Sequence, residues 1–194
     1  PDATKIILQQ QANGALIMDY AGHGSAGQLS HEKVIALKDF STATNTNLPL
    51  WITAACDVMP FDGVEDNIGE AAVLNANGGA VAFYGTTRTV YANRNKYMNR
   101  AFLQRVLSLK DGKPMPIGEA HRLAQNDLVL GNVIGYDSKG QPIKETDLTT
   151  NRLQYALLGD PAMPLNIPTQ KVVVDSINGI AVDGATELPV LKAG

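Results

Sequence analysis

The feature that most constrains the fold is an apolar run, Leu50–Ala55, that leads directly into the only cysteine of the chain, Cys56. Pro49 precedes the run and Pro60 follows it shortly afterwards, so it has the length of a strand. Because the run is apolar without alternation, it is typical of a strand that is buried on both faces of a parallel sheet. Open α/β folds bind their ligands at the carboxyl ends of such strands. The run therefore predicts that Cys56 lies at the ligand-binding edge of a sheet.

A second apolar run, Ala15–Tyr20, leads into the tetrad Gly22-His23-Gly24-Ser25. If the two strands are parallel neighbours, His23 and Cys56 lie at the same edge. A thiol beside an imidazole indicates a cysteine nucleophile with histidine as its general acid/base. The flanking glycines permit a tight turn and leave the Gly24 amide free to stabilise an oxyanion together with the Cys56 amide. The alternative is an inert buried cysteine and an ordinary exposed histidine in a glycine turn.

Strand-like and helix-like segments alternate along the chain, which is typical of an α/β domain with a mainly parallel sheet. Apolar periodicity and caps predict helices over residues 4–12, 31–40 (capped by Ser30), 66–75, 93–109 and 116–128. Strands are predicted over residues 15–20, 50–56, 80–84 and 152–158.

Composition limits the domain count and the classes of partner. With 194 residues, 44% of them apolar, the chain can bury one sizeable core. A net charge of −3 argues against nucleic acid or an anionic membrane surface as the main partner. No apolar stretch is long enough to span a bilayer. Because the chain begins at Pro1 rather than methionine, we expect it to be a piece of a longer protein, so the missing signal peptide says nothing about its compartment.

The segment from Lys171 onward has short β-like pieces separated by the turn signals Asn178-Gly179 and Asp183-Gly184. We expect residues 1–168 to form part of a catalytic domain. Residues 169–194 are then expected to be a linker and the truncated start of a β-sandwich-like module.

Charged residues near the two strand ends leave several interpretations open. Between Asp39 and Thr87 there is no lysine or arginine, but six acids occur: Asp39, Asp57, Asp62, Glu65, Asp66 and Glu70. These acids could bind a basic substrate or a calcium ion. Alternatively they mark the solvated start of a helix, where acidic side chains suit the helix dipole, and we favour this interpretation. Arg88 would bind a substrate carboxylate or phosphate, or pair with these acids, which we favour.

The remaining titratable side chains are assigned structural roles. Asp19 lies four residues before His23 and either orients the imidazole or accepts a structural hydrogen bond. His31 and His121 are read as surface histidines on helices, and neither has metal-ligand spacing to Cys56. The sequence predicts no cofactor and no metal.

Five segments together resemble the gingipain-type cysteine peptidases, which have a caspase-like α/β/α sandwich. These segments are residues 19–25, residues 48–56, residues 69–71 with 77–82, residues 84–88, and residues 158–161. The resemblance runs from about Leu16 to Pro168. It implies a cysteine endopeptidase in which Cys56 is the nucleophile, His23 the general acid/base, and the Gly24 and Cys56 amides the oxyanion hole. The acidic partner of the histidine and much of the specificity pocket come, in this family, from an earlier part of the sheet that is not in this chain.

Within that family, residues 56–62 and 86–91 look most like the PorU-type sortase of the type IX secretion system. This resemblance implies an enzyme secreted to the bacterial cell surface and associated with the outer membrane. Such an enzyme removes the C-terminal secretion signal of cargo proteins and can attach the cargo to a lipopolysaccharide amine, so its partners would be cargo, other secretion-system components and the lipopolysaccharide acceptor. Two alternatives stay open: a broad secreted endopeptidase, and a non-catalytic docking module with the same fold.

Overall fold

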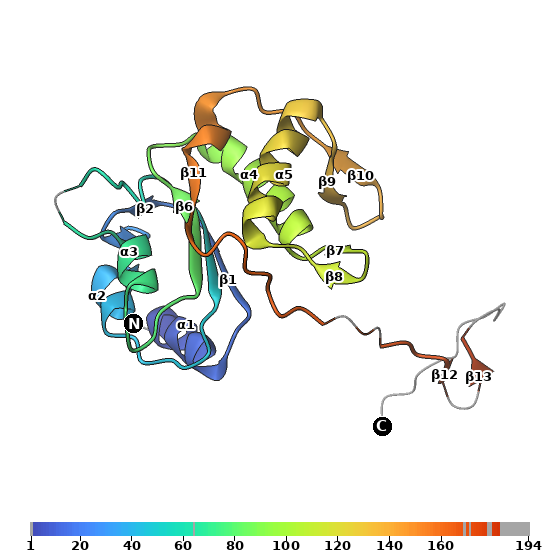
Figure 1. The fold of residues 1–194 in the computed structure, drawn as a ribbon, viewed down its shortest axis with the longest axis horizontal. Helices are drawn as coiled ribbons and strands as arrows, with labels where there is room; N and C mark the ends of the chain where they lie inside the picture. Colours follow the sequence, from blue (N-terminus) through green and yellow to red (C-terminus); the bar gives the residue numbers. More distant parts are fainter. Residues whose placement is uncertain (1, 64, 169, 171, 178–179, 183–194) are drawn as a thin grey trace.

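In the computed structural model of the chain, one four-stranded sheet divides the molecule into two layers (Figure 1). The residues described are 2–63, 65–168, 170, 172–177 and 180–182. The strand order is β1-β5-β6-β11, with β1, β5 and β6 parallel and β11 antiparallel to β6. Their bounds are Ile17–Ala21, Leu50–Ala54, Ala82–Thr86 and Tyr155–Gly159. The predicted α/β class with a mainly parallel sheet is confirmed.

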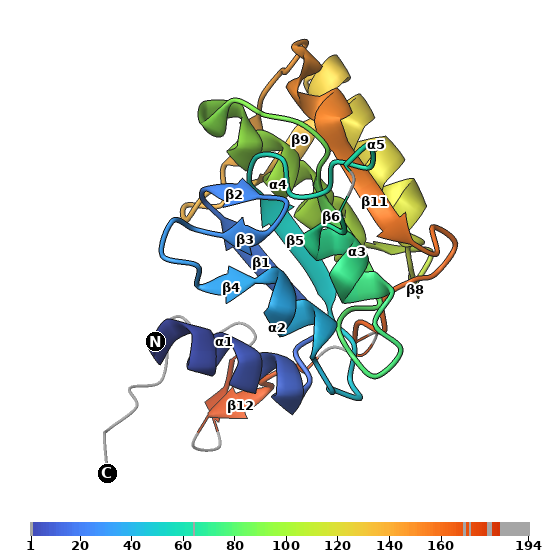
Figure 2. The ribbon, with the colours of Figure 1, turned by 90° about the vertical axis from the view of Figure 1, so that its left-hand side faces the viewer.

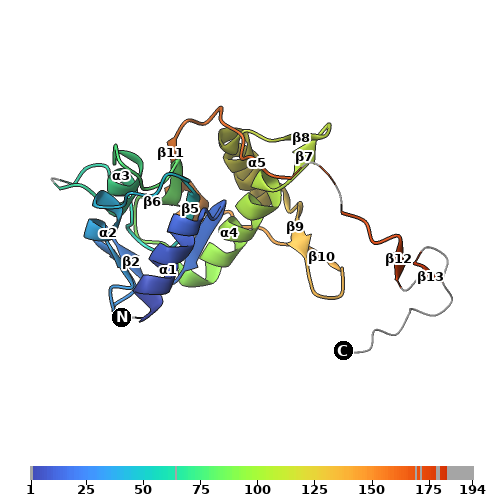
Figure 3. The same cartoon turned by 90° about the horizontal axis from the view of Figure 1, so that it is seen from below.

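Helices cover both faces of the sheet (Figures 1 and 3). On one face lie α1 (Asp2–Asn13), α2 (Leu37–Ser41) and α3 (Ile68–Val73), which pack on Trp51 and Phe83. On the other face α4 (Ala92–Val106) and α5 (Ile117–Leu130) pack on Ile52 and Tyr84. Alternate residues of β5 and β6 therefore enter opposite cores, which explains why both runs are apolar throughout.

The start of α3 explains part of the acidic run. The Asn67 side chain accepts a hydrogen bond from the Glu70 amide, and the Glu70 carboxylate accepts one from the Asn67 amide. This reciprocal arrangement is a capping box, which satisfies amides that the first helical turn leaves unpaired. The prediction that acids mark a helix start is confirmed for Glu70.

The predicted helix over residues 31–40 is wrong. Residues 31–34 instead form a turn, and Ile35–Ala36 form the short strand β4, so only α2 is helical. Strand β4 pairs antiparallel with β3 (Gln28–Leu29), which in turn pairs antiparallel with β2 (Gly24–Ser25) (Figure 2). Ser30 and Lys33 have φ values of 63° and 55°, in the left-handed region, which a right-handed helix excludes. Of the apolar residues that suggested a helical face, Ile35 is buried from strand β4, whereas Val34 lies in the preceding turn and Leu37 begins α2.

Shorter elements complete the chain. The predicted strand over 152–158 begins later, because a 3₁₀ turn, η1 (Thr150–Gln154), precedes β11. Two hairpins flank α5, formed by β7 (Leu109–Lys110) with β8 (Lys113–Pro114) and by β9 (Val133–Tyr136) with β10 (Pro142–Lys144). Near the C-terminus, β12 (Ser176–Ile177) and β13 (Ile180–Ala181) pair on either side of the Asn178-Gly179 signal. The Asp183-Gly184 turn lies outside the described residues. Among the helices described, none is both long and apolar enough to cross a membrane.

His121 is not a surface histidine, contrary to the prediction. Its ring lies edge-on to that of Tyr84, with Nδ1 3.3 Å from the Tyr84 hydroxyl, and Nε2 lies 3.3 Å from the Gln125 amide nitrogen. Burial lowers the pKa of His121, because the charged imidazolium is poorly solvated there. The unfolded chain therefore binds this proton more readily than the folded chain.

We expect His121 to make the protein less stable in mild acid. Because the unfolded state binds more protons as the pH falls through the ordinary histidine value of about 6.5, stability is lost on the acid side. Replacing His121 with glutamine should flatten the dependence of the melting temperature on pH between about 7.5 and 5.5. The matched control is His31→Gln, which removes an exposed histidine; an equal flattening in both variants would contradict the assignment.

Candidate active site

The two loops singled out in the sequence follow neighbouring strands at the same edge of the sheet. The parallel pairing of β1 with β5 ends at Ala21 opposite Ala54, and the Gly22 amide then donates to the Ala54 carbonyl at 3.3 Å. His23 and Cys56 each lie two residues beyond this last pair. Parallel strand ends thus bring the two loops together, as the sequence predicted.

Gly24 makes the contact between the loops. A Cβ atom placed on Gly24 would lie 2.7 Å from Val58 Cγ1, 2.8 Å from Ala55 Cβ and 3.3 Å from the Cys56 carbonyl oxygen. These distances are too short for a real side chain, so only glycine lets the histidine loop approach this closely.

The Cys56 side chain is half-buried and lies against Val90, in the loop between β6 and α4. The thiol donates a hydrogen bond to the Val90 carbonyl at 3.4 Å and accepts one from the Val90 amide at 3.5 Å. In the part of the chain that the structure describes, no hydrogen bond joins this thiol to the His23 ring. In this structure the thiol is therefore hydrogen-bonded to Val90 rather than to the imidazole.

Asp57 turns the chain sharply after Cys56. Its φ of 50° lies in the left-handed region, which aspartate tolerates better than most residues. The turn is held to the neighbouring loop, since the Asp57 amide donates to the Arg88 carbonyl at 3.3 Å and the Thr89 hydroxyl donates to the Asp57 carboxylate at 2.6 Å. Asp57 thus has a structural role in presenting Cys56 at the end of β5.

His31 lies next to His23, which sequence analysis missed because residues 31–40 were expected to form a helix. The two exposed rings are 5.0 Å apart between centroids, with planes inclined at 52°. Nearby Glu32 has a lowered pKa, chiefly through local hydrogen bonds to its own backbone and to Ser30, with smaller contributions from the charges of His31 and His23. Three titratable side chains, His23, His31 and Glu32, therefore lie close together at this face of the loop.

Asp19 does not contact His23 in the way that an orienting carboxylate would. Both of its oxygens accept hydrogen bonds from the Asn99 amide of α4, at 3.1 and 3.2 Å. Desolvation raises the pKa of Asp19, and the bond from Asn99 offsets part of that effect. Of the two interpretations, the structure supports the structural acceptor.

Tyr155 lies at the start of β11 and is buried. Its ring is stacked against Tyr84, and burial, with smaller contributions from the neighbouring Cys56 and Asp19, raises its pKa. Its hydroxyl is buried without a hydrogen-bond partner among the described residues. It therefore stays protonated beneath the strand ends.

Arg88 pairs with the acidic run, as favoured from the sequence. Its guanidinium lies 2.7 Å from the Asp62 carboxylate, and both side chains are largely exposed. Such a pair contributes at most about 1 kcal/mol. With Phe61 it lines a cavity of about 410 Å³ beside the Cys56 loop. In the described part of the chain, the histidines, cysteine and acids form no group of three or more that could hold a metal ion.

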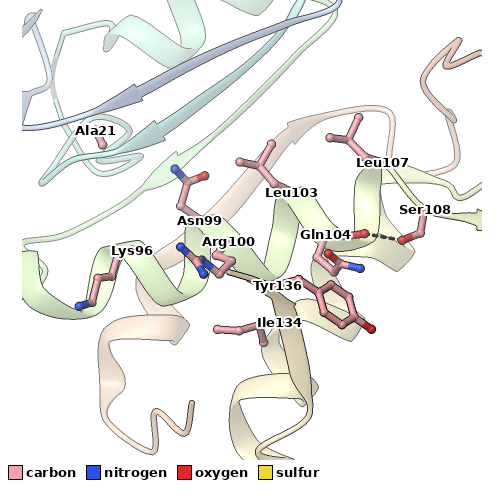
Figure 4. A pocket seen from close by; sticks show the side chains of 11 residues that line it. Ala21, Lys96, Asn99, Arg100, Leu103, Gln104, Leu107, Ser108, Ile134 and Tyr136 are labelled. Carbon is pink, nitrogen blue, oxygen red and sulfur yellow. Dashed lines mark hydrogen bonds between the residues drawn. The ribbon is translucent and has the colours of Figure 1, made fainter. Parts of the chain in front are cut away.

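A larger cavity, of about 560 Å³, is lined by the end of β1, by α4 and by β9 (Figure 4). Figure 4 shows Asn99 and Leu103 of α4, Tyr136 of β9 and Ala21 of β1 around it. Ala21 is two residues before His23, but neither His23 nor Cys56 lines the cavity. The cavity is therefore adjacent to the two loops and separate from them.

Comparison with known proteins identifies the fold and the family of the chain. Among curated proteins, no sequence matches the chain. The structure is similar to the crystal structure of the Arg-specific cysteine proteinase gingipain R (RgpB), with a TM-score of 0.62 and 18% identity over 87% of this chain and 37% of that one. It is also similar to the complex of Porphyromonas gingivalis RgpB pro- and mature domains, with a TM-score of 0.60 and 18% identity over 87% of this chain and 38% of that one.

A third structure, described only as a protease, gives a TM-score of 0.57 and 17% identity over 81% of this chain and 37% of that one. The chain thus spans less than two-fifths of the length of these proteins. The similarity identifies the fold as that of the gingipain-type cysteine peptidases. The profile of peptidase family C25 matches residues 1–166, most of the sequence. The chain therefore belongs to peptidase family C25, the gingipain family.

Proposed function

We propose that the chain carries the catalytic dyad of a cysteine peptidase, with Cys56 as nucleophile and His23 as general acid/base. The observation that supports this most directly is the meeting of the two loops at the ends of β1 and β5, with Gly24 against the Cys56 backbone. Membership of family C25 and the free thiol at this edge agree with it.

The reaction would proceed through an acyl-enzyme. The Cys56 thiolate attacks the scissile carbonyl, and the Gly24 and Cys56 amides stabilise the resulting oxyanion. The Cys56 amide is available for this role, since it donates to no carbonyl in the described part of the chain. His23 then protonates the leaving amine, which leaves a thioester on Cys56. Water releases the product as a carboxylate, whereas an amine releases it as an amide.

For the physiological reaction we propose removal of the C-terminal secretion signal from type IX secretion cargo at the bacterial cell surface, with attachment of the cargo to a lipopolysaccharide amine. The support is the resemblance of residues 56–62 and 86–91 to the PorU-type sortase. In the proposed domain organisation, residues 1–168 are part of the catalytic domain, and the hairpin β12–β13 begins a β module.

The test uses the complete protein, a cargo protein with its C-terminal signal, and ethanolamine as the amine probe. Mass spectrometry of the trimmed cargo should find an ethanolamine amide at the new C-terminus in addition to the free carboxylate. Trimming that yields only carboxylate would contradict the transpeptidase part. Cleavage of generic arginine or lysine peptides without preference for the signal would favour the broad endopeptidase. A Cys56 thiol that does not react with iodoacetamide would favour the docking module.

The close approach of Gly24 gives a prediction with a matched control in the same loop. Gly24→Ala should reduce the rate of Cys56 acylation at least tenfold, because a Cβ there would collide with Ala55 and push the histidine loop outward. Gly27→Ala should leave the rate within about twofold of wild type, since a Cβ at Gly27 meets nothing within 4 Å. Equal effects of the two substitutions, measured with a chromogenic ester, would contradict this role of Gly24.

A further inference from the structure

The hydroxyl of Tyr20 holds the backbone of the histidine loop. It donates a hydrogen bond to the His23 carbonyl oxygen at 2.8 Å, and the Ser30 amide donates to the same oxygen at 2.8 Å. Gly22 makes room for the phenol, since a Cβ at Gly22 would lie 2.5 Å from the Tyr20 oxygen. The carbonyl of His23 is therefore held by two donors, and one of them is a side chain to which the proposed mechanism assigns no role.

The held carbonyl belongs to the same peptide group as the Gly24 amide. This group is planar and trans, so its C=O and N–H bonds point in opposite directions. Strands β2 and β3 are antiparallel, and in such a ladder hydrogen-bonded residue pairs alternate with pairs that exchange no hydrogen bond. The Ser30 amide bonds to the His23 carbonyl, so His23 and Ser30 form a hydrogen-bonded pair. The next pair, Gly24 opposite Leu29, is therefore one that exchanges no hydrogen bond. The Gly24 amide is therefore left unused by β3 and is available to a substrate carbonyl.

We infer that Tyr20 is a positioning residue for the oxyanion hole, because its hydroxyl fixes the His23–Gly24 peptide group and so aims the Gly24 amide. The inference rests on the proposed function, since it requires Cys56 as nucleophile. A hydrogen bond to the carbonyl also polarises the peptide group, which strengthens its N–H as a donor. Burial raises the pKa of Tyr20, with a smaller contribution from the Glu32 charge, so the hydroxyl remains a donor throughout the pH range of an assay.

Two small reagents, p-nitrophenyl acetate and iodoacetamide, distinguish a role of Tyr20 in the oxyanion hole from a general effect on the reactivity of the Cys56 thiol. With p-nitrophenyl acetate, the sulfur attacks the acetyl carbonyl, a C–S bond forms and the carbonyl oxygen becomes an oxyanion. Its collapse breaks the ester C–O bond, which releases p-nitrophenolate and leaves acetyl-Cys56. With iodoacetamide, the sulfur displaces iodide from a saturated carbon, and no oxyanion develops.

Tyr20→Phe should therefore slow acylation by p-nitrophenyl acetate about tenfold, while alkylation by iodoacetamide changes less than twofold. Loss of a complete oxyanion donor costs roughly 10²–10³ in rate, so tenfold is expected for a donor that is misaimed. Both rates are corrected with Cys56→Ala. The matched control is Tyr97→Phe, which removes a hydroxyl from α4 and should leave both rates unchanged.

A second variant tests the same contact from the other side. Gly22→Ala should displace the Tyr20 hydroxyl and reproduce the selective loss of acylation. In the double variant Tyr20→Phe/Gly22→Ala, the loss of acylation rate should be smaller than the product of the two single losses, because both substitutions break the same hydrogen bond.

The outcomes separate the inference from the proposed function. Unchanged acylation in Tyr20→Phe, or an equal loss with both reagents, would overturn the inference while leaving the dyad intact. If wild-type Cys56 is acylated no faster than the Cys56→Ala background, the proposed function fails and the inference fails with it. Slower reaction with both reagents in His23→Ala supports the proposed function independently of Tyr20.

Discussion

Replacement of Cys56 with alanine should abolish cargo trimming by the complete protein, with a rate loss of at least about 10³-fold. His23→Ala should cost about as much, because nucleophile and base act as one unit and removal of either disables both. The measurement is the appearance of trimmed cargo, followed by mass spectrometry. Acylation by p-nitrophenyl acetate gives the same comparison for the chain without any cargo.

Both variants should remain folded, because neither side chain belongs to either of the two buried clusters. Their melting temperatures should therefore stay close to that of the wild type, which excludes unfolding as the cause of the lost activity. Continued trimming of cargo by Cys56→Ala would contradict the assignment of Cys56 as the nucleophile. Normal alkylation of Cys56 in His23→Ala at pH 6.5 would show that the histidine does not help to form the thiolate, since an ordinary thiol is mostly protonated there.

Replacement of Arg105 with methionine should destabilise the protein by about 3 kcal/mol. The Arg105 guanidinium of α4 makes two hydrogen bonds of 2.6 Å to the carboxylate of Asp127 on α5, and the Asp127 side chain is only 2% exposed. Asn132 donates a further bond to this carboxylate at 2.9 Å. Without the guanidinium, a buried carboxylate keeps only the Asn132 amide. We choose the lower end of the usual range because 30% of the Arg105 side chain is exposed.

The expected loss corresponds to a decrease of roughly 6–12 °C in melting temperature for a chain of this size. The control is Arg122→Met, whose ion pair with Glu119 is open to solvent, and this change should leave the stability almost unchanged. The double variant Arg105→Met/Asp127→Leu should regain most of the stability, since no unpaired charge remains in it. A melting temperature for Arg105→Met equal to that of Arg122→Met would contradict the assigned role of the buried pair.

The positions of the strands that carry the site were predictable from the sequence. The run before Cys56 is apolar on both faces, and a strand covered on both sides buries such a run completely. The run before His23 carries Asp19 and forms the edge strand β1, which is only partly buried. Once the two strands are taken as parallel neighbours, both loops are expected at one edge of the sheet, even before any contact between them is known. The start of α3 was predictable for a similar reason, because the Asn67–Glu70 capping box is a local signal.

Other features depended on contacts between residues that are distant in sequence or on unusual backbone angles. The left-handed conformations of Ser30 and Lys33 replaced the start of an expected helix by a turn that leads into strand β4, and His31 of this turn lies beside His23. His121 became buried because its helix faces Tyr84, which lies 37 positions earlier in the chain.

Periodicity reports which faces of a segment are apolar, but it does not report which polar groups meet across the fold. The same holds for the hydrogen bond from the Tyr20 hydroxyl to the His23 carbonyl. These residues are only three apart in sequence, but the bond depends on the turn at Gly22, which periodicity does not report. The sequence by itself thus determined that the His23 and Cys56 loops meet at one edge of the sheet, because each follows a strand-forming run. The tertiary structure decided which side chains surround these loops, because those contacts join segments whose meeting no local pattern reports.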